Sequence, residues 1–193
     1  MTERSVRPAT SADLESFAKV LRDRAFFDDR HKRQLNKDGV LFLGWLGSRP
    51  AGVVYLWMEE AEEQPIRDHL PHVPLIMNLE VHKDLRRNGV GTALVREAER
   101  HLLAKGHYRV ALAVRTDNHD AARLYDDLGY RDWGHDKVTC LAAVTSPDGT
   151  VVSEKEVCHV LVKDLVPITP VPRTEVDADR RFTAVLTRPS PPA

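Results

Sequence analysis

Cysteine, long apolar runs and an excess of either charge are all scarce in this 193-residue chain. No apolar run approaches the length that crosses a membrane, and the polar start Met1–Arg7 lacks the apolar segment of a signal peptide. Two cysteines cannot make a disulfide framework, which fits a reducing compartment. Because 28 basic side chains accompany 29 acidic ones, no basic field for nucleic acid is indicated. We therefore expect a cytoplasmic protein whose partners include neither nucleic acid nor membrane.

Metal-binding patterns are also missing from the sequence. None of the nine histidines belongs to a His-Glu-x-x-His pattern, and Cys140 and Cys158 are not spaced as Cys-x-x-Cys. His69 and His72 are better explained as scattered surface residues. We therefore expect no metal cofactor.

The most informative segment, Asn78 to Arg100, is predicted to form a strand end, a basic turn and an amphipathic helix. After Gly89 and Gly91, apolar residues recur at helical spacing as far as Leu102. A helix N-terminus exposes unpaired N–H groups and partial positive charge, which favour phosphate. Glycine at such positions lets a bulky anion approach the backbone without meeting a Cβ. The pattern predicts a pyrophosphate-binding loop.

Two common nucleotide motifs do not account for this loop. A kinase-type loop needs Gly-Lys-Ser/Thr, but Thr92-Ala93 follows Gly91. A dinucleotide fingerprint needs a small third residue, whereas Leu94 stands there and would obstruct close helix–strand packing. The next predicted strand also runs into Arg115 instead of an acidic residue. Both classes are therefore disfavoured.

The pattern Arg86-x-x-Gly89-x-Gly91 resembles the Gln/Arg-x-x-Gly-x-Gly/Ala signature of the GNAT superfamily of acyl-CoA-dependent N-acyltransferases. A second block follows in the family's order and at its usual separation, and it is similar to the family element Asn-x-x-Ala-x-x-Leu-Tyr-x-x-x-Gly-Phe/Tyr. Two glycines alone would be weak evidence, but the two blocks together are specific. The resemblance covers roughly residues 4–165. The matching residues of the second block are Asn118, Ala121, Leu124, Tyr125, Gly129 and Tyr130.

This resemblance, with alternating helix and strand patterns, predicts one α/β domain over residues 1–165. We expect a GNAT-like mixed sheet of about seven strands flanked by about four helices, with central parallel strands splayed to admit acyl-CoA. The proline-rich residues 166–193 are expected to form a tail, in which 181–186 could add an edge strand.

The predicted elements are read from apolar periodicity and turn residues. A capping box at Thr10–Asp13 is expected to begin the first helix. The segment 59–74 is predicted to be a loop with room for one helical turn. The strands are predicted at Ser5–Pro8, Val40–Leu46, Ala51–Met58, Leu75–Val81, Tyr108–Val114, Lys137–Thr145 and Glu154–Lys163, and helices at 11–24, at 26–36, after Gly89 as far as Lys105-Gly106, and in the second block.

The resemblance also implies roles for residues of the site. Pantetheine would pair with the backbone of Leu79 and Val81, and an N–H near Val81 would face the thioester carbonyl, where a fixed donor can lower the barrier by about 3 kcal/mol. Tyr125, at the family's general-acid position, would protonate the departing thiolate, and Asn118 would position the pantetheine arm. The residues expected to bind acetyl-CoA are Leu79, Val81, Arg86, Arg87, Asn88, Gly89, Val90, Gly91, Thr92 and Asn118.

The base that takes the proton from the amine is the least determined residue. Some relatives that acetylate protein N-termini carry Glu where this chain has Ala113, which argues against such a substrate. Glu80 remains as a base, directly or through water. Its alternative is a polar residue at a strand bulge that faces solvent or pairs with an arginine. His82 and His72 are lesser candidates.

Two further patterns have alternative explanations. The acidic stretch Glu59–Glu63 could steer a cationic amine toward the cleft, although such runs are more often solvated loops. Cys140 and Cys158 are predicted to be reduced, mostly buried and approximately opposite each other in a hairpin centred near Asp148-Gly149.

Together these residues predict transfer of an acetyl group from acetyl-CoA to a primary amine, with a small molecule favoured as acceptor, by direct attack in a ternary complex. The rival is a non-catalytic acyl-CoA-binding or regulatory module, and acyl-CoA hydrolysis is a lesser alternative. GNAT proteins often dimerise through their C-terminal strands, so a homodimer is compatible with the resemblance. The acceptor and the acyl-chain preference are not determined by the sequence.

Overall fold

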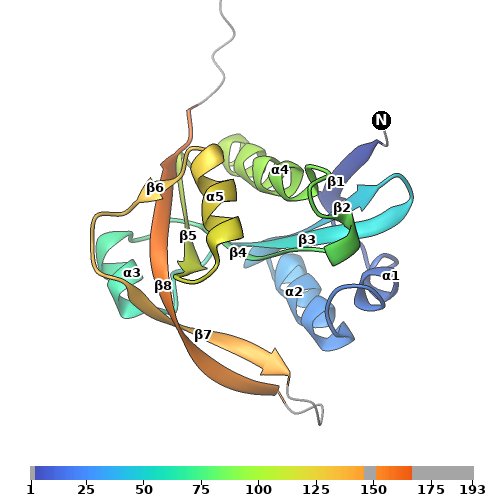
Figure 1. Cartoon of the computed structure of the whole chain (residues 1–193), viewed down its shortest axis with the longest axis horizontal. Coiled ribbons are helices and arrows are strands. Elements are labelled where there is room, and N and C mark those ends of the chain that lie inside the picture. The colour runs from blue at the N-terminus through green and yellow to red at the C-terminus, as the bar shows by residue number, and fades with distance from the viewer. Residues whose placement is uncertain (1–2, 146–150, 167–193) are drawn as a thin grey trace, which may run out of the picture.

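The computed structural model describes residues 3–145 and 151–166. A single eight-stranded sheet has the order β1-β2-β3-β4-β5-β8-β6, and β7 pairs with β8 (Figure 1). Neighbouring strands are antiparallel except for the central pair, β4 and β5. The strands are β1 (Arg4–Pro8), β2 (Gly39–Leu46), β3 (Arg49–Trp57), β4 (Leu75–Val81), β5 (Arg109–Arg115), β6 (Arg131–Asp132), β7 (Val138–Thr145) and β8 (Val151–Asp164).

Helices cover both faces of the sheet, and the apolar side chains divide into two cores. One core contains Leu94, Ala98 and Leu102 of α4, together with residues of α5. The other contains Phe17 of α1 and Phe27 of α2, whose rings pack edge to face at 6.3 Å, together with residues of α3. The helices are α1 (Leu14–Ala18), α2 (Arg24–Asn36), α3 (Gln64–His69), α4 (Val90–Ala104) and α5 (His119–Asp127), and Lys83–Leu85 form a 3-10 turn.

The predicted fold class is confirmed: the described residues form a mixed α/β sheet with helices on both faces. The strand predicted at Leu75–Val81 is found with those bounds. The helix after Gly89 ends at Ala104, where Lys105 is the C-cap and Gly106 has a φ of +83°. At the far end, β8 stops at Asp164, and the expected tail, including the strand at 181–186, lies outside the described residues.

The first helix is shorter than predicted, because 11–24 does not form one continuous helix. The Asp13 carboxylate accepts hydrogen bonds from the backbone and hydroxyl of Thr10 at 2.9 and 2.6 Å, and α1 begins only after it. Asp23 then caps a second helix by accepting from the Phe26 N–H at 2.8 Å. The break between the helices allows Phe17 and Phe27 to enter the same core.

The two cysteines lie on paired strands but are not directly opposite each other. Cys158 pairs with Val138 and Cys140 with Glu156, so the cysteines occupy diagonal positions. Both thiols are free, and burial raises the pKa of each. The turn of this hairpin, 146–150, lies outside the described residues.

A buried charged group ties three segments together on the α4 face. Glu99 of α4 is 8% exposed, and the Lys163 ammonium of β8 donates to both of its carboxylate oxygens at 2.8 Å. The Tyr130 hydroxyl, just after α5, donates to the same carboxylate at 2.9 Å. Burial and the nearby Glu99 charge raise the pKa of Tyr130. The group therefore fixes α4 and the end of α5 to the sheet.

Removing one partner of this group is expected to leave a buried charge without compensation. We predict that Lys163→Met lowers the free energy of unfolding by about 2 kcal/mol, a reduced value because the lysine is partly exposed. Asp164→Asn is the matched control, since it removes the exposed pair with Arg109 and should change stability by less than about 0.5 kcal/mol. Urea unfolding measures both. Equal losses in the two variants would contradict a stabilising role for the buried group.

Candidate active site

The site is built around a gap between the two central parallel strands. β4 and β5 pair through one position only, Leu75 with Ala111, and beyond it the described residues of the two strands are not paired. Toward the other neighbour, β3, the register shifts near Asn78, which has a φ of +54°. This bulge bends β4 away from β5. The carboxyl ends of the two strands are therefore splayed, as the resemblance implied.

The splay leaves backbone groups of β4 facing the gap. The His82 N–H donates to the Ala51 carbonyl of β3 at 2.8 Å. Successive N–H groups of a strand point to opposite sides, so the Val81 N–H points away from β3 and toward the gap. On the same side, the Arg86 Nε donates to the Val81 carbonyl at 3.3 Å. Val81 thus offers a donor where the resemblance called for one.

The helix N-terminus beyond β4 has the geometry of an anion-binding loop. Gly89 is the N-cap of α4, with φ and ψ of +73° and +10°, and no side chain caps the helix there. Arg87 also has a positive φ, of +61°. Left-handed residues in such a loop turn successive N–H groups toward one concavity, and the helix adds partial positive charge. These features fit a phosphate group.

The presence of glycine has a different physical explanation at each of the two positions of this loop. A Cβ on Gly89 would collide with the Arg4 guanidinium, and the positive φ is itself unfavourable for other residues. A Cβ on Gly91 would meet only Leu124 and Val81, at ordinary contact distances of 3.5 and 3.6 Å. The protein itself therefore does not require glycine at position 91, and the space above it belongs to a cavity.

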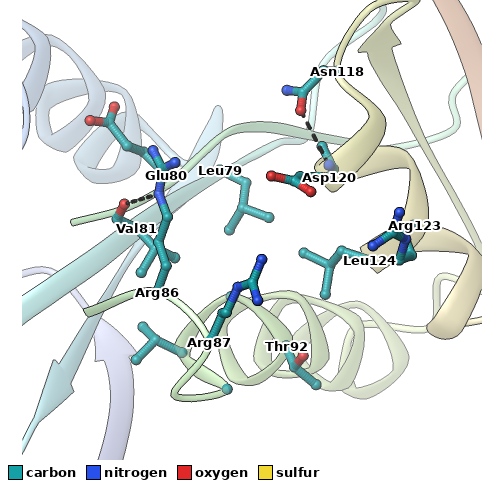
Figure 2. A pocket seen from close by; sticks show the side chains of 14 residues that line it. Leu79, Glu80, Val81, Arg86, Arg87, Thr92, Asn118, Asp120, Arg123 and Leu124 are labelled. Atoms are coloured by element: carbon teal, nitrogen blue, oxygen red, sulfur yellow. Dashed lines mark hydrogen bonds between the residues drawn. The ribbon is translucent and has the colours of Figure 1, made fainter. Parts of the chain in front are cut away.

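This first cavity has a volume of about 470 Å³ and lies between β4, the start of α4 and α5 (Figure 2). Asn88 is outside its lining, and its amide instead donates to the carbonyls of Leu85 and Arg86 within the loop. Two lining residues that the sequence analysis did not name are Asp120 and Arg123, one helical turn apart on α5. The predicted residues in the lining are Leu79, Glu80, Val81, Arg86, Arg87, Gly89, Val90, Gly91, Thr92 and Asn118.

A second cavity, of about 410 Å³, adjoins the first, and the two share Leu79, Asn118 and Ala121. Asn118 caps α5 by accepting from the Ala121 N–H at 3.2 Å, and it lines both cavities. Tyr125 lines the second cavity. That Asn118 positions the pantetheine arm stays a prediction, and its place where the two cavities meet is compatible with that role.

The Tyr125 side chain is buried at the wall of the second cavity. It is 6% exposed, its ring packs against Tyr130 at 5.6 Å, and its hydroxyl has no hydrogen-bond partner among the described residues. Burial raises its pKa above the ordinary value of 10.0. The hydroxyl therefore stays protonated at neutral pH and is available to a ligand in the second cavity.

Glu80 lines the first cavity but is held by a partner outside it. The Arg22 Nε lies 2.7 Å from its carboxylate, and both side chains are 32% exposed. In Figure 2 the carboxylate turns toward the far side of β4, away from Arg87 and Asp120. Pairing with an arginine was the alternative named for Glu80, so a role as base would require this ion pair to open.

The two lesser candidates for the base, His82 and His72, each contact an acidic residue of the protein. The His82 imidazole accepts from the Asp84 N–H at 3.4 Å, and His72 faces Glu60 at 3.3 Å with its side chain 82% exposed. Neither histidine lines the two cavities.

Comparison with known proteins agrees with this geometry. A profile of the acetyltransferase (GNAT) family matches residues 7–130. The chain belongs to this family. Over 52 residues it is 38% identical to acetyltransferase ECA0875 of Pectobacterium atrosepticum, a match that spans 27% of this chain and 37% of that protein.

Solved GNAT structures share the fold. The ribosomal-protein-S18-alanine N-acetyltransferase of Escherichia coli matches with a TM-score of 0.58 and 16% identity, over 84% of this chain and 94% of its own. The yncA acetyltransferase of Salmonella typhimurium, solved with its cofactor acetyl-CoA, matches with a TM-score of 0.59 and 13% identity, over 85% and 95%. At these identities the likeness shows the fold alone. In the described residues no helix is both long and apolar enough to cross a membrane.

The Gly91 position gives a direct test of the first cavity. Gly91→Asp should keep the fold, because its Cβ meets only ordinary contacts, but should lower acetyl-CoA affinity at least about a hundredfold by adding bulk and negative charge. Calorimetric titration measures the affinity, and thermal unfolding checks the fold. Ala104→Asp, at the exposed far end of α4, is the control for added charge. A folded Gly91→Asp protein with wild-type affinity would contradict the assignment.

Proposed function

We propose that this protein transfers an acetyl group from acetyl-CoA to a primary amine of a small molecule, by direct attack in a ternary complex. The observation that carries the proposal is the junction of two cavities at Leu79 and Asn118, with the Tyr125 hydroxyl in the second. Two substrates that approach from opposite sides would meet there. Holding them in one place removes most of the entropic cost of a bimolecular reaction.

The first cavity would hold acetyl-CoA. The backbone from Gly89 to Thr92 would bind the pyrophosphate, Arg86 and Arg87 would add charge at the rim, and the gap-facing backbone of Leu79 and Val81 would pair with pantetheine. Arg86 would then exchange the Val81 carbonyl for phosphate. Acetyl-CoA supplies an activated acyl carbon with a thiolate as leaving group. The fit rests on the open space above Gly91 and the unpaired edge of β4.

In the reaction, a neutral amine nitrogen forms a bond to the acyl carbon and the carbon–sulfur bond breaks. The Val81 N–H would stabilise the negative charge that develops on the thioester oxygen. The Tyr125 hydroxyl would give its proton to the departing thiolate, and the amine would lose a proton to a base. Glu80, directly or through water, remains the proposed base, once its ion pair with Arg22 opens.

The same ion pair favours a second candidate function, a non-catalytic acyl-CoA-binding module, because it occupies the proposed base. The two candidates differ in turnover. Calorimetry with acetyl-CoA, followed by a thiol-release assay over a panel of primary amines, separates them. Tight binding without amine-dependent thiol release would favour the module, whereas amine-dependent release would favour the enzyme.

Replacing Tyr125 tests the proton donor. Tyr125→Phe should lower kcat by about a hundredfold, because the general acid is lost. Acetyl-CoA affinity and thermal stability should stay near wild type, since the hydroxyl has no hydrogen-bond partner among the described residues. Tyr108→Phe, at an exposed position outside both cavities, is the matched control. A Tyr125→Phe protein with wild-type kcat would remove the proposed role.

The raised pKa of Tyr125 also predicts the shape of the pH profile. An acid donates only below its pKa, and burial raises the pKa of Tyr125, so the donor is retained as pH rises past 10.0. The value of kcat/KM should therefore rise with pH as the amine and base lose protons, and should show no falling limb centred near pH 10. A falling limb centred near pH 10 or below that disappears in Tyr125→Phe would show that the pKa of Tyr125 is not raised.

A further inference from the structure

The wall of the second cavity is acidic. Among the described residues that line it are three carboxylates, Glu62, Glu63 and Glu156, and one basic side chain, Arg115. Arg115 is itself paired with Glu156 at 3.2 Å and with Asp117 at 2.6 Å. The cavity therefore has an excess of negative charge that comes chiefly from Glu62 and Glu63.

The acidic stretch of the sequence divides into two parts with different surroundings. Glu59 lies 3.9 Å from Arg33, and Glu60 lies 3.3 Å from His72, so both have partners at the surface. Glu62 and Glu63 line the second cavity, and neither is in an ion pair with any described residue. Glu62 is exposed, as Glu59 and Glu60 are, whereas Glu63 is partly buried, so the explanation as a solvated loop fits Glu63 least well.

Glu63 is held in place by its neighbours, and its carboxylate forms no ion pair with a described residue. It is the N-cap residue of α3, yet its side chain makes no capping hydrogen bond. Arg67 donates to the carbonyls of Ala61 and Glu62, both at 2.6 Å, and Ile66 is 1% exposed, so the segment is anchored. The Glu63 charge also contributes to the raised pKa of Cys140, after burial, which places the carboxylate beside a thiol of the cavity wall.

One further polar group of this cavity has no hydrogen-bond partner among the described residues. Tyr125 is nine-tenths buried and lines the cavity, and its hydroxyl can donate to or accept from a ligand there. The acidic wall and the unpaired hydroxyl together suit a ligand with N–H donors and positive charge.

We infer that the acceptor is a small dicationic amine, in which one nitrogen attacks at the Asn118–Tyr125 junction and Glu63, aided by Glu62, binds the second ammonium group. This inference rests on the proposed function and names its substrate class. An acceptor with a carboxylate or phosphate near the amine would meet repulsion from the same wall. Glu63 acts as a specificity residue, since it binds the non-reacting end of the substrate.

A matched pair of substrates tests the inference. In the thiol-release assay, 1,4-diaminobutane should have a kcat/KM at least about tenfold above that of n-butylamine, which lacks the second charge. Glu63→Gln should lower kcat/KM for the diamine by about tenfold, mainly through KM, and leave n-butylamine unchanged. Glu59→Gln is the control, because Glu59 lies outside the cavity and should change neither substrate. Equal use of both amines by the wild type, or equal losses in Glu63→Gln, would overturn the inference.

A binding measurement separates this inference from the proposed function. Calorimetry of 1,4-diaminobutane with the coenzyme A-saturated protein needs no turnover. Binding that is weakened in Glu63→Gln supports the dicationic site even if no amine is acetylated, in which case the proposed function alone fails. Turnover of n-butylamine without diamine preference or diamine binding overturns the inference alone. Absence of both diamine binding and amine turnover overturns both.

Discussion

The site depends on the incomplete pairing of β4 and β5. A parallel pair in the middle of a sheet would normally be hydrogen-bonded along its length, but here the pairing stops at Leu75 and Ala111. The bulge near Asn78 preserves the β3–β4 ladder while it turns β4 away from β5. The sheet thus gains a row of unpaired backbone donors and acceptors in its interior, where a ligand can replace the missing strand contacts.

Rigidity around this gap comes from elements on its two sides. On one side β5 pairs with β8 along its length, and on the other β4 continues the ladder with β3. The buried Glu99–Lys163–Tyr130 group connects α4 and the end of α5 to β8. Because both helices that border the first cavity are attached to the same strand, the start of α4 and Tyr125 keep a fixed relation.

The second cavity collects side chains from segments far apart in the chain. Glu63 precedes α3, Asn78 lies at the β4 bulge, and Tyr125 lies on α5. Each has a local alternative explanation when it is considered alone, as a solvated loop residue, a polar strand residue or a packed aromatic. Only their convergence on one space gives them a common use. The acidic wall also explains how one GNAT scaffold could select its acceptor by charge without altering the acyl-CoA side.

Features that depend on local backbone chemistry could be predicted from the sequence: β4 with its bounds, the glycine turn and the amphipathic α4. The break at Lys19–Asp23 was missed, because it arises from the need to bury Phe17 and Phe27 in one core.

Tertiary contacts decided the rest. The sequence could not show that Arg22 pairs with Glu80 or which glutamates of the acidic stretch line a cavity. Helix periodicity and positive φ are properties of neighbouring residues, so a sequence determines them directly. Charge pairing and cavity walls join distant residues, and they exist only once the sheet and its helices have been assembled.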